Sequence, residues 1–360
     1  MKGWIIRNQR PEIRDQRNSM AATMKAWQYP APGPIDSSIG LIDSASKPEP
    51  QHLGDAQLLV RVAACGLNPA DYKIQEMGLV ARAVLGYPKT VGMDLSGEVI
   101  AKGKAVADLQ VGDRIVGRLN PMGKPGALSE YAVVDRANAA VLAPNQDLVD
   151  AAGIPTAGLT AYQSIAPYVQ EGRGDRVFIN GGSGGVGTLS VQIAKILGCH
   201  VTVTCSTAKV DLVKELGADE IIDYKTTNVI DKLTKDGRKF HLIVDNVGNS
   251  PADLFSASNS YLDDGCPYVF VGGKMSFASV KNLLMARLLP RLLGGVNGRL
   301  VTYLTKDKQE DLELLSRWVA EGRLRVLIDK VFKFDEAKTA IQYVKKGSCS
   351  GKTVVKVLDQ

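Results

Sequence analysis

A glycine-rich stretch near the middle of the chain has the composition and spacing of a phosphate-binding turn. It runs from Asn180 to Gly187 and follows a short apolar run that is typical of a strand. In a GxGxxG turn one glycine permits the tight bend, the next lets backbone N–H groups approach a pyrophosphate, and the last lets a helix pack closely on the strand. We therefore expect a dinucleotide to bind here. The predicted contacts are Gly182, Ser183, Gly184, Gly185, Val186 and Gly187.

The residues about 20 positions further on indicate which dinucleotide binds, because an NAD site places an Asp or Glu there against the ribose 2′-hydroxyl. This chain has Cys205-Ser206-Thr207-Ala208-Lys209 instead. No carboxylate in this run would repel a 2′-phosphate, and two hydroxyls and an ammonium could bind it. The sequence therefore predicts NADPH, with Ser206 and Lys209 at the phosphate, although Ser206 or Thr207 could also cap the helix that follows.

The glycine turn requires a strand before it and a helix after it, and the surrounding sequence supplies a repeated strand–helix alternation from Ala151 onward. Apolar residues recur at helical spacing after the first two strands, and Gly198 and Gly217 stop those helices. This alternation predicts a parallel sheet with helices on both faces. The predicted strands are 176–180, 200–204, 220–223, 242–244 and 268–271.

The rest of the chain has a different pattern, in which strand-like segments predominate. Residues 25–150 contain short strand-like runs broken by Gly, Pro and Asp, which indicates a compact β domain. Residues 325–360 return to β character with one helix near 335–346, so that the C-terminus can rejoin the first domain. A chain of 360 residues is long enough for two such domains.

The charge and cysteine content of the chain indicate which partners and which cellular compartment to expect. Residues 1–24 carry five basic and two acidic side chains, hence +3 of the total formal charge of +6. We expect a flexible extension there, with a mitochondrial targeting segment as the alternative. The remaining chain is only mildly basic, which does not favour nucleic-acid binding. Five scattered cysteines without a CxxC pattern indicate reduced thiols and a cytoplasmic or mitochondrial protein.

The most apolar stretch, Leu283 to Val296, is interrupted by two arginines and is too short to span a bilayer. A buried helix is its simplest interpretation. A peripheral membrane contact or a subunit interface is the alternative.

Six motifs, spread between Met24 and Leu358, together resemble one enzyme family. They are Asn68-Pro-Ala-Asp71, Gly92-Met-Asp-Leu-Ser-Gly97, Val111-Gly-Asp-Arg-Ile115, Gly158-Leu-Thr-Ala-Tyr162, Gly182–Gly187 and Gly351-Lys-Thr-Val-Val355. The set is similar to the medium-chain dehydrogenase/reductase superfamily, in its zinc-independent quinone oxidoreductase and enone (enoyl) reductase branch. The resemblance implies an α/β protein: a GroES-like β-rich domain over 25–150, completed by about 325–360, and a Rossmann doubly wound parallel sheet over 151–324, with the active site between them.

The resemblance allows the presence of a zinc site to be checked residue by residue. Zinc-dependent members take three catalytic ligands from positions that correspond to Asn68, Met93 and Thr156 in this chain. A zinc site needs thiolate, imidazole or carboxylate ligands. We therefore predict no metal.

The resemblance also implies further cofactor contacts beyond the glycine turn. Thr160 would meet the nicotinamide carboxamide and Tyr224 the 2′-phosphate, while Asn246 would line the adenosine–ribose side. Val271 and Gly272 would lie near the nicotinamide ribose, and Lys352 would be a last phosphate contact.

The family chemistry is hydride transfer from NADPH to the activated C=C of an α,β-unsaturated carbonyl, which needs donors at the carbonyl oxygen and a proton for the α-carbon. The resemblance implies Asn68 and Lys73 as carbonyl or ribose-hydroxyl ligands. Tyr72 or Tyr87 would be the proton donor, with ordered water as an equal rival, and Asp71 would bond backbone.

Alternatives to this chemistry remain open. They are reduction of a quinone, enoyl reduction in trans within a biosynthetic pathway and, more remotely, non-catalytic NADPH binding at a membrane or partner. The expected substrate is a small enone, alkenal or quinone, and the expected assembly is a homodimer.

Overall fold

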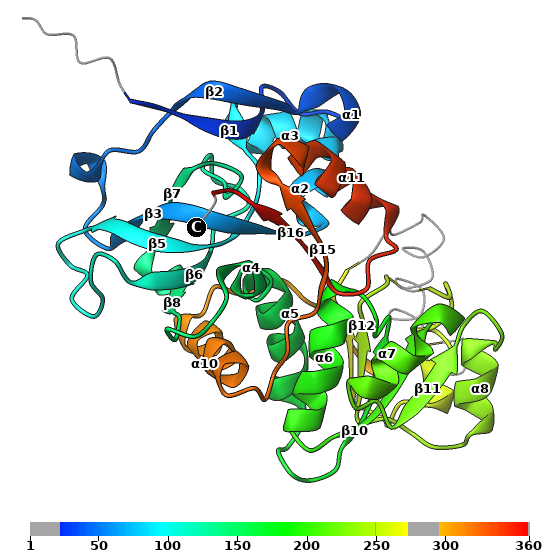
Figure 1. Cartoon of the computed structure of the whole chain (residues 1–360). Coiled ribbons are helices and arrows are strands. Elements are labelled where there is room, and N and C mark those ends of the chain that lie inside the picture. The colour runs from blue at the N-terminus through cyan, green and yellow to red at the C-terminus, as the bar shows by residue number, and fades with distance from the viewer. Residues whose placement is uncertain (1–21, 249, 273–294, 359–360) are drawn as a thin grey trace, which may run out of the picture.

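The computed structural model describes residues 22–248, 250–272 and 295–358. The chain forms two lobes: a β-rich lobe built from the N-terminal half and the C-terminal end, and a second lobe built from the middle of the chain (Figure 1). The predictions for residues 1–21, and nearly all of the apolar stretch from Leu283 to Val296, lie outside the described residues.

The second lobe is built on a six-stranded sheet in which every neighbouring pair is parallel. Its strands are β9 (Arg176–Asn180), β10 (His200–Cys205), β11 (Glu220–Asp223), β12 (Leu242–Asp245), β13 (Pro267–Phe270) and β14 (Arg299–Thr302). The spatial order β11-β10-β9-β12-β13-β14 is the 3-2-1-4-5-6 order of dinucleotide-binding sheets. The predicted Rossmann sheet is confirmed. Its strand order reverses between β9 and β12, and ligands bind such sheets outside the carboxyl ends of the strands at this point.

Alternate side chains of β9 show that both faces of this sheet are covered. Val177 and Ile179 are fully buried in one core with the helices α5, α6 and α10, whereas Phe178 is buried in a second core that includes α8. Burial of each such side chain stabilises the fold by roughly 1.5–3 kcal/mol. The helices of this lobe are α5 (Pro155–Ile165), α6 (Gly185–Ile196), α7 (Val210–Glu215), α8 (Val229–Lys235) and α10 (Gln309–Ala320).

The β-rich lobe contains a seven-stranded sheet and a smaller three-stranded one. The larger sheet has the order β15-β16-β3-β5-β6-β8, and β7 also pairs with β3. The strands are β1 (Thr23–Tyr29), β2 (Gly40–Ser46), β3 (Gln57–Leu67), β4 (Lys89–Thr90), β5 (Asp94–Lys102), β6 (Arg114–Arg118), β7 (Tyr131–Asp135), β8 (Ala139–Val141), β15 (Ile328–Lys333) and β16 (Lys352–Lys356). The helices are α1 (Ile35–Ser38), α2 (Ala70–Lys73), α3 (Leu79–Val84), α4 (Leu148–Ala151) and α11 (Ala337–Lys346).

The C-terminal strand joins the two lobes at the place where the site lies. β16 pairs antiparallel with β3, which is the contact that completion of the first domain by residues 325–360 requires. Just before β16, Gly351 forms an isolated parallel bridge with Gly184 of the glycine turn. Within the described residues, no helix has both the length and the apolar character needed to cross a membrane.

Candidate active site

The glycine turn is held in place by Thr204, which lies on the neighbouring strand β10. The Thr204 hydroxyl donates to Asn180 Oδ1 (2.7 Å) and accepts from the Gly181 N–H (2.8 Å). The Thr204 carbonyl accepts from the Gly182 N–H (2.9 Å). The first half of the turn is therefore anchored to the sheet, and the second half leads into α6.

The glycines of the turn differ in what surrounds them. A Cβ at Gly182 would lie 1.8 Å from Val203 Cγ2, and one at Gly187 would lie 2.1 Å from the Gly181 carbonyl oxygen. Both positions exclude a side chain, because Gly182 lies against Val203 of the neighbouring strand β10 and Gly187, at the start of α6, lies against the backbone of the turn. A Cβ at Gly184 would have no neighbour within 4 Å. Gly184 therefore faces open space, which suits the close approach of a ligand.

The start of α6 has backbone N–H groups that precede its first intrahelical hydrogen bond. The first intrahelical hydrogen bond runs from Thr188 N to the Gly184 carbonyl (2.9 Å), so the N–H groups of residues 185–187 lie ahead of the helical pattern. A helix N-terminus with free N–H groups favours an anion. Ser183 is half-buried at the same turn. The geometry fits a pyrophosphate.

The predicted 2′-phosphate residues gather at the carboxyl ends of β10 and β11. Lys209 Nζ donates to the Ser348 carbonyl (2.8 Å) and to Ser350 Oγ. Ser206 precedes a short 3-10 turn, and its hydroxyl makes no capping hydrogen bond. The Tyr224 N–H donates to the Cys205 carbonyl (3.1 Å), which places Tyr224 beside Ser206, and its side chain is 51% exposed.

The structure corrects the sequence-based interpretation of this corner in two respects. Thr207 does not cap the following helix, because its hydroxyl donates to Asp223 Oδ2 (2.6 Å). A carboxylate is therefore present after all, contributed by the next strand rather than by the run after β10. The hydrogen bond from Thr207 lowers the pKa of Asp223, so this carboxylate is charged at neutral pH.

Asn246 supplies independent evidence for a ligand beside the glycine turn. It follows β12, and its N–H donates to the Asn180 carbonyl (3.2 Å). Both polar atoms of its side chain are buried, and neither has a hydrogen-bond partner in the part of the chain that the structure describes. Buried amides are normally satisfied, so an unpaired one at the switch point of the sheet fits a hydrogen-bonding ligand.

The next strand of the sheet ends close by. The Val271 N–H donates to the Asp245 carbonyl (3.0 Å). Gly272 has no atom within 4 Å of a Cβ built on it. Together with the unsatisfied Asn246, the open glycines and the helix N-terminus form a cradle that fits a dinucleotide.

A buried polar cluster in the β-rich lobe contains three residues from distant parts of the sequence. Asn68 Nδ2 donates to Asp94 Oδ2 (2.8 Å), and Lys352 Nζ donates to Asn68 Oδ1 (2.7 Å) and to the Leu67 carbonyl (2.9 Å). The ammonium lies 3.7 Å from Asp94 Oδ2. None of the three side chains is more than 5% exposed. We call Asn68, Asp94 and Lys352 the buried cluster.

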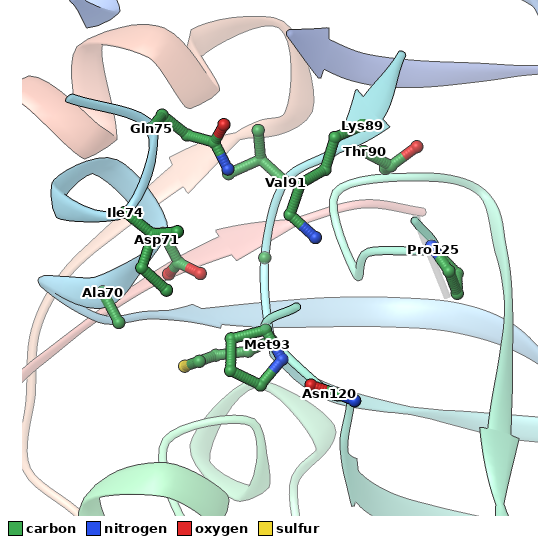
Figure 2. Close-up of a pocket in the computed structure, with 12 residues that line it drawn as sticks. Ala70, Asp71, Ile74, Gln75, Lys89, Thr90, Val91, Met93, Asn120 and Pro125 are labelled. Atoms are coloured by element: carbon green, nitrogen blue, oxygen red, sulfur yellow. The ribbon is translucent and has the colours of Figure 1, made fainter. Parts of the chain in front are cut away.

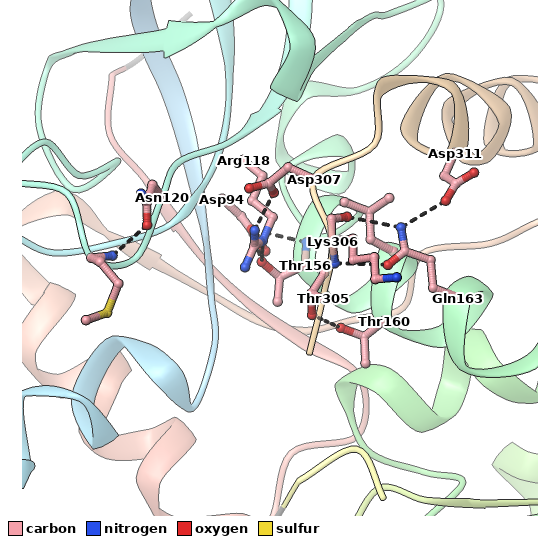
Figure 3. A network of polar contacts seen from close by, with 12 residues as sticks. Asp94, Arg118, Asn120, Thr156, Thr160, Gln163, Thr305, Lys306, Asp307 and Asp311 are labelled. Carbon is pink, nitrogen blue, oxygen red and sulfur yellow. Dashed lines mark hydrogen bonds and ion pairs between the residues drawn. The ribbon is translucent and has the colours of Figure 1, made fainter. Parts of the chain in front are cut away.

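The cluster continues across to α5 (Figure 3). Thr156 donates to Asp94 Oδ1 from its N–H (3.1 Å) and its hydroxyl (2.5 Å), and Arg118 Nε donates to Thr156 Oγ1 (3.0 Å). Arg118 also pairs with Asp307, in the segment between β14 and α10. Thr160 shares a hydrogen bond with Thr305 of that segment (2.8 Å). The predicted nicotinamide contact Thr160 is therefore bonded to the same segment that pairs with Arg118.

The positions of the family's zinc ligands do not fit a metal in this chain. The Asn68 amide and the Thr156 hydroxyl are both bound to Asp94, and Met93 is buried with only 2% exposure. An amide, a thioether and a hydroxyl are not a zinc ligand set. Among the described residues, no group of three or more His, Cys, Asp or Glu side chains could hold a metal ion.

The structure does not bring every predicted catalytic residue to this cluster. Tyr72 is buried in the core of the β-rich lobe, under the ammonium of Lys345 (5.9 Å to the ring centre), and burial raises its pKa. Its predicted role as proton donor is therefore not supported by its position. The Tyr87 hydroxyl donates to Gln75 Oε1 (2.8 Å). Lys73 ends α2 and is half-buried.

Two further predicted site residues have other roles in the structure than the sequence indicated. The Asn68 amide is fully engaged, since its nitrogen also donates to the Gly66 carbonyl (3.3 Å), so it orients its neighbours and has no donor left for a substrate carbonyl. The Lys352 side chain passes Gly185, but its ammonium turns to Asn68 and the Leu67 carbonyl rather than toward the glycine turn. This arrangement does not favour the predicted contact between Lys352 and a phosphate.

Asp71 has the predicted backbone-bonding role, because its Oδ2 accepts from the Asn68 N–H (2.7 Å). Sequence reasoning missed Asp94 and Arg118 as site residues. Asp94 directly follows Met93 in a recognised motif, so the motif held a usable signal. No local signal marks Arg118.

Comparison with known proteins agrees with this fold. Residues 54–145 match the family described as alcohol dehydrogenase GroES-like domain, and residues 216–355 match the family described as zinc-binding dehydrogenase. The chain is 41% identical to the trans-enoyl reductase pgmF of Aspergillus terreus, over 94% of this chain and 98% of that protein. It is 30% identical to a chloroplastic quinone-oxidoreductase homolog of Spinacia oleracea, over 93% and 99%.

The solved structure of the quinone oxidoreductase from Coxiella burnetii superposes with a TM-score of 0.80 at 30% identity, covering 94% of this chain and all of that one (100%). The chain therefore belongs to the medium-chain dehydrogenase/reductase superfamily, in its quinone oxidoreductase and enoyl reductase branch, and it is an oxidoreductase. The resemblance inferred from the sequence motifs is confirmed.

Proposed function

We propose that this protein is an NADPH-dependent, zinc-independent reductase that transfers a hydride to the activated C=C of an α,β-unsaturated carbonyl. The observation that carries the proposal is that the side chains at two of the family's three zinc-ligand positions, Asn68 and Thr156, are both hydrogen-bonded to Asp94. Hydride addition to a conjugated C=C produces a delocalised enolate, which hydrogen-bond donors can stabilise.

The cradle at the carboxyl ends of the parallel strands supports a nicotinamide dinucleotide. When bound, NADPH would supply the hydride. Residues 182–187 would hold the pyrophosphate, and Asn246 would gain the hydrogen bonds that it lacks in the described chain. The remaining contacts are proposed at Thr160, Ser206, Lys209, Tyr224, Val271 and Gly272.

The preference for NADPH over NADH rests on the side chains at the end of β10. Lys209 brings a cation to this corner and the Ser206 hydroxyl has no capping bond to give up. Both can bind a phosphate. Asp223 works against this preference, but its Oδ2 accepts from Thr207 and its Oδ1 from the Lys225 N–H (2.9 Å).

The proton for the α-carbon is proposed to come from ordered water or from Tyr87. Tyr72 is not retained, because it lies in the core under Lys345. Asn68 is proposed as a positioning residue that holds Asp94 against Lys352. Lys73 is kept as a ligand of the substrate carbonyl or a ribose hydroxyl.

The relatives favour two variants of the same chemistry. Their names describe trans-enoyl reductases and quinone oxidoreductases. An enoyl reductase working in trans would act on a carrier-bound thioester, and a quinone oxidoreductase would pass the hydride to a quinone. The substrate class stays a small molecule in either case, and the homodimer stays a prediction.

A substrate panel tests the proposal. NADPH consumption would be followed with a short alkenal, a long alkenone, an enoyl thioester, a benzoquinone and a naphthoquinone, each repeated with NADH, and the products would be identified. We expect NADPH-dependent formation of the saturated carbonyl from an enone or enoyl substrate. Consumption with quinones only would favour the quinone variant. Binding of NADPH without consumption on any substrate would contradict the proposal.

A further inference from the structure

The β-rich lobe contains a small recess beside the buried cluster that the proposed hydride transfer does not use (Figure 2). Its volume is about 20 Å³, which is room for roughly one water molecule or one hydroxyl group. The lining includes Asp71, Gln75, Lys89, Met93 and Asn120. Met93 directly precedes Asp94, and Asp71 accepts from the Asn68 N–H, so the recess adjoins the cluster at two points.

Two opposite charges point into this recess (Figure 2). Asp71 is 8% exposed and Lys89 is 6% exposed. Each has one hydrogen bond outside the recess: Asp71 Oδ2 accepts from Asn68, and Lys89 Nζ donates to the Gly123 carbonyl. The described residues show no direct ion pair between the two side chains, so the recess separates a carboxylate from an ammonium.

The pKa values of Asp71 and Lys89 indicate that the two charges stabilise each other only in part. Burial raises the pKa of Asp71 to about 7 and lowers the pKa of Lys89 to about 8. The charged form of each side chain is therefore less stable than it is in water. A polar group placed between the two would complete their hydrogen bonds.

The chemistry of the two side chains selects the type of group. The Lys89 ammonium has three N–H donors, of which one is used within the described part of the chain, and the Asp71 carboxylate is an acceptor. A hydroxyl can accept from Lys89 and donate to Asp71 at once. A carbonyl can satisfy the ammonium but not the ionised carboxylate. A hydrocarbon satisfies neither charge and leaves each with only its hydrogen bond outside the recess. Water fits as well, so a substrate hydroxyl would replace a bound water.

We propose that the recess between Asp71 and Lys89 is a substrate subsite for a hydroxyl group, so that the enzyme selects hydroxylated enones over hydrocarbon enones of the same length. The inference rests on the proposed function, because it assumes that the substrate lies beside the buried cluster. A chain that extends past Met93 would place its hydroxyl between the two charges.

The test compares matched pairs of enones that differ only in one hydroxyl, placed at successive positions along the chain. We expect kcat/KM to favour one hydroxylated member by roughly 10- to 100-fold, as for a hydrogen bond to a charged group. Lys89→Met should abolish this preference while retaining turnover of the hydrocarbon enone. Lys124→Met is the matched control, since Lys124 is an exposed lysine in the adjoining loop, and it should keep the wild-type preference.

A second variant guards against misfolding. Asp71→Asn/Lys89→Met removes both charges together and leaves an amide oxygen for the Asn68 N–H, and it too should lose the preference. Equal kcat/KM for both members of every pair in the wild type, or an unchanged preference in the two variants, would overturn the inference while the proposed function stood.

A binding arm separates failure of the subsite from failure of the reaction. Saturated hydroxyketones and ketones of equal length would be titrated calorimetrically into the NADPH-loaded protein. Tighter binding of the hydroxyketone to wild type than to Lys89→Met supports the subsite even when no enone is reduced, in which case the proposed reaction is wrong. Equal affinities for both ligands would overturn the subsite whatever the enone assays show.

Discussion

Replacement of Lys352 by methionine separates the two roles that this residue could have, a buried counterion or a phosphate contact. Its ammonium is 3.7 Å from Asp94 Oδ2, and both side chains are almost fully buried, at 3% and 0% exposure. At an effective dielectric constant of about 20, two unit charges at this separation attract by about 4 kcal/mol. Lys352→Met should therefore leave a buried carboxylate without its counterion.

The expected loss of stability is about 2 to 4 kcal/mol, somewhat below the range for breaking a fully buried pair. The reason is that Asp94 keeps the hydrogen bonds from Asn68 and Thr156. Lys352→Met/Asp94→Asn removes both charges and should recover much of the loss, with a coupling energy of about 2 kcal/mol. Urea unfolding followed by tryptophan fluorescence and circular dichroism measures both quantities. A loss below about 0.5 kcal/mol, or strictly additive variants, would refute the reasoning.

The same two variants report on the cofactor. Because the ammonium is bound to Asn68 and the Leu67 carbonyl, we expect the Kd for NADPH to change by less than about threefold once the double variant has restored stability. A direct phosphate contact would instead weaken binding by roughly tenfold or more in both variants, with a reduced dependence on salt.

Three further predictions follow from the cofactor cradle and the recess. Lys209→Glu should weaken NADPH roughly 10- to 100-fold more than NADH, because it places a carboxylate at the 2′-phosphate; an unchanged preference in kcat/KM would contradict this pocket. Gly182→Ala should destabilise the fold, because its Cβ meets Val203, whereas Gly184→Ala should leave the melting temperature unchanged and weaken NADPH binding. Burial raises the pKa of Asp71 to about 7, so the neutral form of this side chain stabilises the fold. As the pH rises from about 4 to about 7, wild type should therefore lose stability relative to Asp71→Asn; parallel pH profiles in unfolding titrations would argue against this.

The parallel sheet and its glycine turn were predictable because their signals are local. β9 and β11 have the predicted bounds, since each has apolar residues at its centre and a polar residue at each end. The GxGxxG spacing directly reports the close packing that Gly182 and Gly187 require. A tight strand–turn–helix connection allows few other sequences, so the sequence alone placed the glycine turn between β9 and α6.

The polar side of the site was not predictable in the same way, because tertiary contacts create it. Lys352 and Asp94 are more than 250 positions apart in the chain and meet only because β16 and β5 both pair with β3. Asp223 reaches Thr207 across two neighbouring strands. Tyr72 lies on a four-residue helix, too short for its periodicity to show which side faces the core.

The measurement that tests the central claim most directly is the fate of deuterium from NADPH labelled at the transferable C4 position. With an enone that the panel shows to be consumed, the account predicts one deuterium at the β-carbon of the saturated carbonyl product and a solvent proton at the α-carbon. Deuterium on the carbonyl carbon of an allylic alcohol would contradict it, because the hydride would then have gone to the C=O group rather than to the C=C bond.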